Sequence, residues 1–333
     1  MKTMKKFRVL LLCAVVLFFG CDKNDSLPSL KNLKAGMLEE VITSQKMENA
    51  TSLTLGGEID KRDFAYMKRM MIEGSLSEID LKDATIVAFG KKYPAGEIPR
   101  EAFMINNKTG DAINNPYLKK FIFPEHLISI GIGAFYRCSG LSGSLTIPEG
   151  VTSIEEAAFN GCLGFNGSLT IPNSITSIGQ YAFGGCSNFT GSLLIPNSVT
   201  SMGRSAFAHC SGFAGSLTIS SGVTSIENGT FYFCSGFTGS LTIPENITSI
   251  GSSAFCFCSG FTGSLVIPTS VLQINEHAFS ACESLSDIKV SWPSPIKYNG
   301  GMFPSDKTIY VPSAFLPSYQ SSWEWKYYTL VGY

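Results

Sequence analysis

The sequence predicts a repeat solenoid, mainly β with short helical turns, in which coils of 24 residues stack along one axis. One sequence repeat occurs seven times. The copy from Gly191 to Phe213 reads G-S-L-L-I-P-N-S-V-T-S-M-G-R-S-A-F-A-H-C-S-G-F, and the copy that begins at Gly167 keeps the same frame. A strict period of this length is typical of solenoids, in which each unit contacts mainly its neighbours.

Two residue types mark the period most clearly. A phenylalanine and a cysteine each recur every 24 residues, and we predict that both stack in the core. The phenylalanine ladder is Phe135, Phe159, Phe183, Phe207, Phe231, Phe255 and Phe279. The cysteine ladder is Cys138, Cys162, Cys186, Cys210, Cys234, Cys258 and Cys282.

Each coil contains two short extended segments and one turn. The segment Ser-Leu-Thr-Ile-Pro alternates polar and apolar residues, which indicates a half-buried strand, and its proline ends that strand. The segment Val/Ile-Thr-Ser-Ile is a second short strand, and Ala-Phe-x-x-Cys predicts one tight turn or a short helix. About five apolar side chains per coil, at roughly 1.5–3 kcal/mol each, stabilise stacked coils although a single coil is not stable alone.

Strand alternation also predicts an exposed face. The residues that alternate with Leu and Ile should point away from the core and form two rows along the solenoid. We define the strand face by its twelve residues: Ser144, Thr146, Ser168, Thr170, Ser192, Leu194, Ser216, Thr218, Ser240, Thr242, Ser264 and Val266. Three interpretations remain: a solvated sheet surface, a face that docks a protein or glycan, or a lattice that orders water. The apolar Leu194 and Val266 disfavour the third.

The cysteine ladder admits several interpretations as well. Strands spaced by about 4.8 Å bring neighbouring Cα atoms within disulfide range. However, side chains in register point the same way, and seven is an odd number. One thiol per coil in single file does not make a tetrahedral metal site. The sequence therefore favours buried thiols that pack as small apolar groups, with scattered disulfides as the alternative. We predict no metal and no cofactor.

The first residues have the pattern of a secretory signal. Basic residues precede an apolar run from Val9 to Phe19, which is too short to span a membrane. The run ends at Gly20-Cys21, which resembles a bacterial lipoprotein signal whose cysteine becomes acylated. We therefore predict a signal peptide over residues 1–20, lipid attachment at Cys21 and a tether over residues 21–34. A lipid there would hold the protein on a membrane without a spanning helix, and a plain secreted form is the alternative.

The two ends depart from the period. We predict an N-terminal cap with degenerate repeats over residues 35–112, the seven-unit solenoid over 113–290 and a C-terminal cap over 291–333, because terminal units must cover an open core. The N-terminal cap should contain helices over 35–46 and 60–71, strands over 51–55 and 76–81, and a degenerate repeat over 98–103. The C-terminal cap should contain a strand over 308–312, a helix over 313–323 and covering aromatic residues.

The predicted N-terminal helices and the C-terminal aromatic residues each allow a second interpretation. The first predicted helix places Met37, Leu38, Val41 and Ile42 on one face. The second carries methionines and a phenylalanine that we expect in the core rather than at a cofactor. At the other end, Trp323, Trp325, Tyr327 and Tyr328 are expected to cover the core, although aromatic side chains could also stack on sugars.

Composition and motifs exclude several classes of function. The net charge is −1, and only two basic residues fall between Glu125 and Asp287, which argues against nucleic acid as a partner. The histidines His126, His209 and His277 lie in different units, and none is placed to activate a cysteine. There is no phosphate loop, H-E-x-x-H motif or calcium loop. We therefore expect no enzymatic activity.

The repeat resembles the BspA-like bacterial leucine-rich repeats. The matching residues are L-x-I-P, then V-T-S-I-G, then A-F-x-x-C in each unit. The resemblance implies a curved, right-handed solenoid on a surface protein that is often tied to adhesion. It does not specify a ligand.

Together these features predict a lipid-anchored binding or adhesion module of the cell envelope. We expect an outer-membrane lipoprotein, exposed on the cell surface, whose partner is an extracellular or envelope protein or a glycan. The alternative is a periplasm-facing structural or assembly partner.

Overall fold

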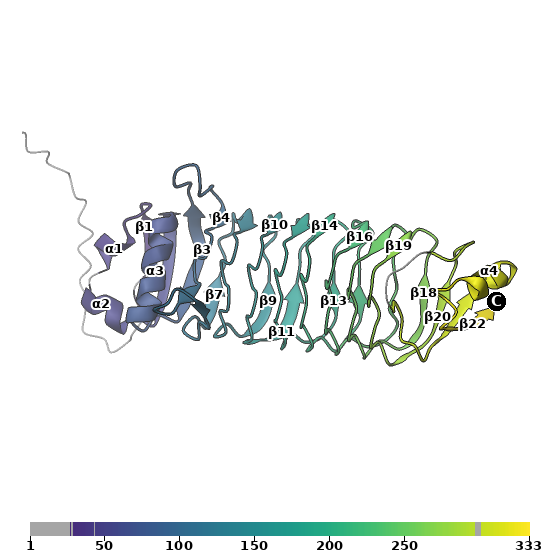
Figure 1. Ribbon diagram of the computed structural model, residues 1–333. Helices are drawn as coiled ribbons and strands as arrows, with labels where there is room; N and C mark the ends of the chain where they lie inside the picture. The colour runs from purple at the N-terminus through teal and green to yellow at the C-terminus, as the bar shows by residue number, and fades with distance from the viewer. Residues whose placement is uncertain (1–26, 28, 43, 297–300) are drawn as a thin grey trace, which may run out of the picture.

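The computed structural model describes residues 27, 29–42, 44–296 and 301–333. It is an elongated β-solenoid with a small helical region at its N-terminal end (Figure 1). Parallel strands pair with partners 24 residues away, as Ser153 does with Ser177. The predicted fold class is therefore confirmed. Cys21 and the predicted signal peptide lie outside the described residues.

Many coils contribute a strand to each of two rows. In Figure 1, one row runs along the lower part of the solenoid and the other along its upper edge. The first row contains β7 (Lys120–Ile122), β9 (Gly143–Thr146), β11 (Phe165–Thr170), β13 (Leu193–Leu194), β15 (Leu217–Thr218), β18 (Gly263–Ile267) and β20 (Leu285–Val290). The second contains β4 (Glu97–Ile98), β8 (Ser129–Ile130), β10 (Ser153–Ile154), β12 (Ser177–Ile178), β14 (Ser201–Met202), β16 (Ser225–Ile226), β17 (Ser249–Ile250) and β19 (Gln273–Ile274).

The phenylalanine ladder forms the core between these rows. Phe159 and Phe183 have ring centroids 5.5 Å apart and nearly parallel planes, at 3°. Stacking extends beyond the seven periodic rings, because Phe103 stacks on Phe135 and Phe303 on Phe279. All seven periodic rings are fully buried. The degenerate repeat expected over residues 98–103 is thus a full member of the stack, whereas the contribution of Phe303 was not predicted.

The Ala-Phe-x-x-Cys segment is a turn rather than a helix. Two residues in each turn have left-handed backbone conformations, two positions before and two positions after the ladder phenylalanine. Around Phe207 these are Ser205, with φ of 52°, and His209, with φ of 61°. Alternate N–H groups of the turn donate to carbonyls of the next coil, as from Phe207 to Thr230 at 2.9 Å. The turns therefore form a third hydrogen-bonded series, which a helix could not provide.

The N-terminal region joins helices to the first row of strands. Its elements are β1 (Leu30–Leu33), α1 (Leu38–Val41), α2 (Ser44–Asn49), β2 (Ser52–Ile59), α3 (Lys61–Glu73), β3 (Glu78–Ile86), β5 (Ile105–Asn106) and β6 (Ala112–Ile113). Strands β1, β2, β3 and β7 form one parallel sheet, and β5 with β6 is an antiparallel hairpin. In α3, Asp60 and Asp63 form a capping box that satisfies the first N–H groups.

The two predicted helices of this region differ in how well they match the structure. The phenylalanine and the three methionines of α3 are buried in the core as predicted. The helix expected over residues 35–46 is instead two short helices, and Val41 is 45% exposed, so the predicted single apolar face was wrong at that residue.

The C-terminal region closes the solenoid with β21 (Thr308–Val311), η1 (Ser313–Phe315), α4 (Leu316–Ser321) and β22 (Thr329–Gly332). Strand β22 pairs with β21 and was not predicted. The indole of Trp325 is fully buried and packs edge-on against Tyr319 at 4.9 Å. In contrast, Trp323 and Tyr327 are 68% and 73% exposed, so the terminal aromatic residues cover the core only in part.

Candidate binding surfaces

The strand face lies along the first row of strands. All twelve of its residues are exposed, while the Leu and Ile residues between them are buried. The Oγ of Ser168 lies 3.3 Å from that of Ser144, and Ser216 and Ser192 repeat this contact. Leu194 and Val266 interrupt the hydroxyl rows at 59% and 48% exposure. The geometry therefore gives a regular, uncharged surface, and its use for binding stays a prediction.

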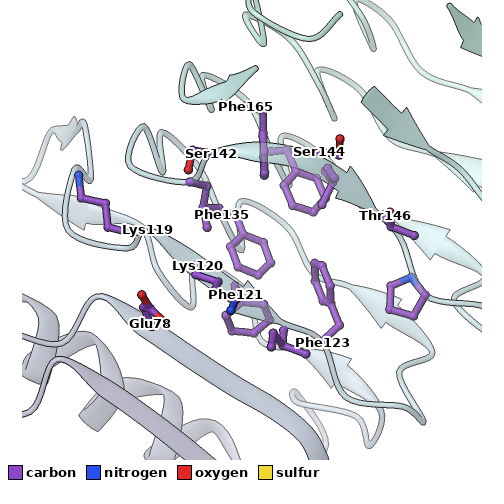
Figure 2. A pocket seen from close by; sticks show the side chains of 15 residues that line it. Glu78, Lys119, Lys120, Phe121, Phe123, Phe135, Ser142, Ser144, Thr146 and Phe165 are labelled. Carbon is purple, nitrogen blue, oxygen red and sulfur yellow. The ribbon is translucent and has the colours of Figure 1, made fainter. Parts of the chain in front are cut away.

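A pocket of about 700 Å³ opens at the N-terminal end of the strand face (Figure 2). It lies between β7 and β9. Phenylalanine side chains from three segments converge in it, namely Phe121 and Phe123 from the first, Phe135 from the second and Phe165 from the third, as Figure 2 shows. Charged side chains lie at one end of the pocket, and hydroxyl groups lie along its other wall. The charged residues are Glu78, Lys119 and Lys120, and the hydroxyl residues are Ser142, Ser144 and Thr146.

A difference in loop length accompanies the pocket. Gly164 lies against the backbone of Leu141 in the same way that Gly140 lies against that of Leu118, so these two leucines are equivalent. Two residues separate Leu118 from Phe121, whereas three separate Leu141 from Leu145. The segment that enters β9 is thus one residue longer than the one that enters β7. Gly143 in this segment has a φ of 81°, which favours glycine, and Gly191 has a φ of 78° at the same position of a later coil.

The two strands beside the pocket are not paired with each other. β7 pairs with β3, and β9 pairs with β11; among the residues that the structure describes, no hydrogen bond joins β7 to β9. Their coils nevertheless remain paired in the second row, through β8 and β10. As a result Phe121 and Phe123 are partly exposed, although the equivalent Leu145 and Ile147 are buried. We did not predict this pocket; the detectable signal in the sequence is the missing residue before Phe121.

The cysteine ladder is a core feature. All seven residues are fully buried, and they and Cys256 are free thiols. Each thiol from Cys162 onward donates to the carbonyl of the ladder phenylalanine of the preceding coil, at 3.0–3.1 Å. Burial raises the pKa of Cys186, Cys234 and Cys282 to about 12, so these thiols stay protonated and unreactive near neutral pH. The alternative of scattered disulfides is therefore not what the structure shows for the ladder.

A second aromatic series lies on the outer side of the turns. His209, Phe233 and Phe257 occupy the second left-handed position of three successive coils, where other coils have Gly161 and Gly185. Phe233 lies 5.5 Å from His209 and 5.4 Å from Phe257, ring centroid to centroid. The two phenylalanines are 41% and 43% exposed. We did not predict this series, because the position varies between units and only its spacing from the ladder phenylalanine identifies it.

The other chemical candidates are dispersed. The three histidines do not come together, and the imidazole Nδ1 of His277 lies 3.2 Å from the Oγ of Ser280. In the described part of the chain, no group of three or more His, Cys, Asp and Glu side chains could hold a metal ion. No helix of that part is long and apolar enough to cross a membrane.

Comparison with solved structures finds several similar bacterial proteins. The chain is similar to a leucine-rich repeat protein from Bacteroides ovatus, with 22% identity and a TM-score of 0.48 over 77% of this chain and 68% of that one. It is also similar to a leucine-rich cell surface protein from Faecalibacterium prausnitzii, with 23% identity and a TM-score of 0.33 over 85% and 79% of the two chains. A leucine-rich repeat protein of T. pallidum is similar with 22% identity and a TM-score of 0.41, over 64% of this chain and 82% of that one. No curated protein matches the chain.

The family assignment comes from the repeats themselves. The sequence model described as the BspA type leucine rich repeat region matches in six copies, over residues 110–238 and 212–305. These segments include the seven periodic turns and more than half of the chain. The protein therefore belongs to the BspA-type leucine-rich repeat family.

Proposed function

We propose that this protein is a lipid-anchored module of the bacterial cell surface that binds a protein or glycan through its strand face. The observation that carries the proposal is the exposure of all twelve strand-face residues in two regular rows, while their neighbours in sequence are buried. Such a rigid row of short strands presents many weak contacts at fixed spacing, which favours an extended partner. Family membership supports a binding role and does not specify the ligand.

The chemistry of the strand face narrows the kind of partner. It carries hydroxyl groups and two apolar side chains, and none of its twelve residues is charged. Hydrogen bonds and apolar contacts, rather than ion pairs, would therefore provide the affinity, and binding should depend little on salt concentration. The proposal includes no catalytic step, because the ladder thiols are buried and protonated.

The proposed location comes from the N-terminal sequence. The basic residues, the short apolar run and Cys21 have the arrangement of a lipoprotein signal. A single lipid chain gives only marginal membrane binding, so stable anchoring needs more than one acyl chain on this cysteine. Replacement of Cys21 with Ala should release the protein from the membrane fraction, and retention of the variant there would contradict the proposed anchor.

The strand face is tested by introducing charge. Thr170 on β11 and Thr218 on β15 are exposed, so the double variant Thr170→Arg, Thr218→Arg should fold like the unmodified protein. We expect it to lose binding to whichever ligand a screen of glycans and matrix proteins identifies. The matched control is Gln180→Arg, Ser201→Arg, which adds the same charge at exposed positions near the second row. Equal loss in both variants, or unchanged binding in the first, would exclude the strand face as the binding site.

A further inference from the structure

The first row of strands is interrupted between β7 and β9, as it also is between β11 and β13. β1, β2, β3 and β7 form a continuous parallel sheet, and β9 begins the next sheet with β11. Between β7 and β9 lies the phenylalanine-lined pocket, which Figure 2 shows with one strand along each side. The two strands therefore present facing edges across an apolar space, which is the arrangement that a sheet has when an inner strand is removed.

The edge of β9 carries unpaired backbone groups. Where neighbouring coils pair in the first row, N–H groups of the buried positions donate to the next coil, as from Ile147 to Thr170 at 3.1 Å. N–H groups of the alternate positions point to the preceding coil, as Ser168 does when it donates to the Oγ of Ser144 at 3.1 Å. The corresponding N–H groups of Ser144 and Thr146 thus point toward the pocket. Lys120 occupies the position of β7 that corresponds to Ser144. It has no hydroxyl group that could accept a hydrogen bond from these N–H groups.

The edge of β7 also directs backbone groups into the pocket, from the side opposite β9. Lys120 and Ile122 take part in the ladder with β3, in register with Glu78 and Asp80. By the same alternation the N–H and carbonyl groups of Phe121 point to the other side, into the pocket. Unpaired strand edges are templates for an added strand, and a slot with two such edges can pair with both sides of one extended segment.

The side chains indicate which peptide fits. An inserted strand would turn alternate side chains inward, onto Phe121, Phe135 and Phe165, and the others outward, level with the strand face. The exposed Lys119 and Lys120 lie at one end of the slot beside a single carboxylate, Glu78. The net charge at that end is positive, so it favours an acidic residue of the peptide.

We propose that an extended segment of a partner protein inserts between β7 and β9 and completes the sheet. Apolar side chains at every second position fill the pocket, and an acidic residue lies at the end formed by Lys119 and Lys120. The proposal rests on the proposed binding function and names a class of partner for it, a protein with an exposed extended segment. A glycan is not expected in the slot, because it cannot satisfy two rows of backbone donors and acceptors at strand spacing.

The probe is a synthetic peptide. A display library of random eight-residue peptides is selected on the purified full chain, and the affinity of the best sequence is measured by titration calorimetry. We expect apolar residues at alternate positions and an acidic residue near one end. Each interior amide of the peptide is then N-methylated in turn. A strand paired on both sides should lose about tenfold or more in affinity at odd and even positions alike, because each loses a hydrogen bond.

Other patterns overturn the proposal. Loss at every second position only means that the peptide pairs with a single edge, and no loss at any position means that the backbone does not pair. Failure to select any peptide has the same consequence. If that failure accompanies loss of ligand binding in Thr170→Arg, Thr218→Arg, then the proposed function stands and only the inserted strand is refuted.

One pair of protein variants tests the edge of β9. Thr146→Pro removes the N–H group that points to the pocket, while proline is tolerated where that group has no partner within the sheet. Thr146→Ala removes the same side-chain hydroxyl and keeps the N–H group. We expect the proline variant to bind the selected peptide at least about tenfold more weakly than the alanine variant. Equal affinities would contradict the proposal; if the proline variant does not fold, the N-methylation series still decides.

Discussion

The thiol of Cys210 donates a hydrogen bond to the backbone carbonyl of Phe183, one coil earlier, at 3.1 Å. The backbone N–H of Cys210 donates to the carbonyl of Phe207 in its own coil, at 3.2 Å. Each inner phenylalanine carbonyl thus accepts one bond from its own coil and one from the next. This arrangement explains why a cysteine recurs at this position, since a small apolar side chain with a weak donor satisfies both the packing and the carbonyl.

The buried thiols predict a loss of stability at alkaline pH. Burial raises their pKa in the folded protein, so the unfolded chain releases protons at a lower pH than the folded one. Their contribution is complete below about pH 8.5 and is lost as pH rises toward about 12, at about 1.4 kcal/mol per pH unit for each thiol. Urea unfolding at pH 8 to 10 measures this slope. Cys186→Ala should reduce it by the share of one thiol, and an unchanged slope would mean that this thiol is already ionised or exposed.

The core stack predicts a large cost for Phe207→Ala. The ring lies 5.2 Å from Phe183 and 5.7 Å from Phe231, so its removal leaves a cavity between two coils. We expect the free energy of unfolding to fall by about 3–5 kcal/mol, measured by chemical denaturation. A loss below about 1 kcal/mol would show that the neighbouring rings close the gap and that the stack is not a rigid core.

Two glycines should differ in their response to alanine. A Cβ at Gly212 would lie 2.5 Å from the carbonyl oxygen of Ser187 and 2.6 Å from that of Phe189, so Gly212→Ala should force two coils apart. At Gly185 a Cβ has room, and the cost arises only from its φ of 74°. We expect Gly185→Ala to cost about 1–2 kcal/mol and Gly212→Ala to cost more. The reverse order in thermal unfolding would contradict the close contact between coils.

The C-terminal region offers a matched pair of tryptophans. Trp325 is fully buried against Tyr319, and its indole N–H donates to the carbonyl of Ile296 at 3.0 Å. Trp323, two residues earlier, is 68% exposed. Trp325→Ala should destabilise the protein by about 3–5 kcal/mol, whereas Trp323→Ala should change stability by less than about 0.5 kcal/mol. Similar values for both would mean that Trp325 does not cover the end of the core.

The parts of the fold that could be predicted from sequence are those that repeat. A residue such as Phe207 recurs with its whole environment, so its period reports its packing directly. The pocket at Phe121 accompanies one residue fewer in a single loop, and this difference leaves the alternation of the strand unchanged. Phe303 and β22 lie where the period ends, so only their contacts reveal them. The repeat position of Phe233 holds different residue types in different coils, and it is buried in none of them. Hydrophobic periodicity therefore cannot identify it.

Surface display is the claim on which the proposed function depends most directly. Intact cells are treated with protease beside a periplasmic marker protein, and released fragments are identified by mass spectrometry. The account predicts fragments from residues 30–333 while the marker stays intact, since the solenoid would lie outside the membrane. Complete protection of the protein beside an intact marker would contradict surface display and would place the strand face toward the periplasm.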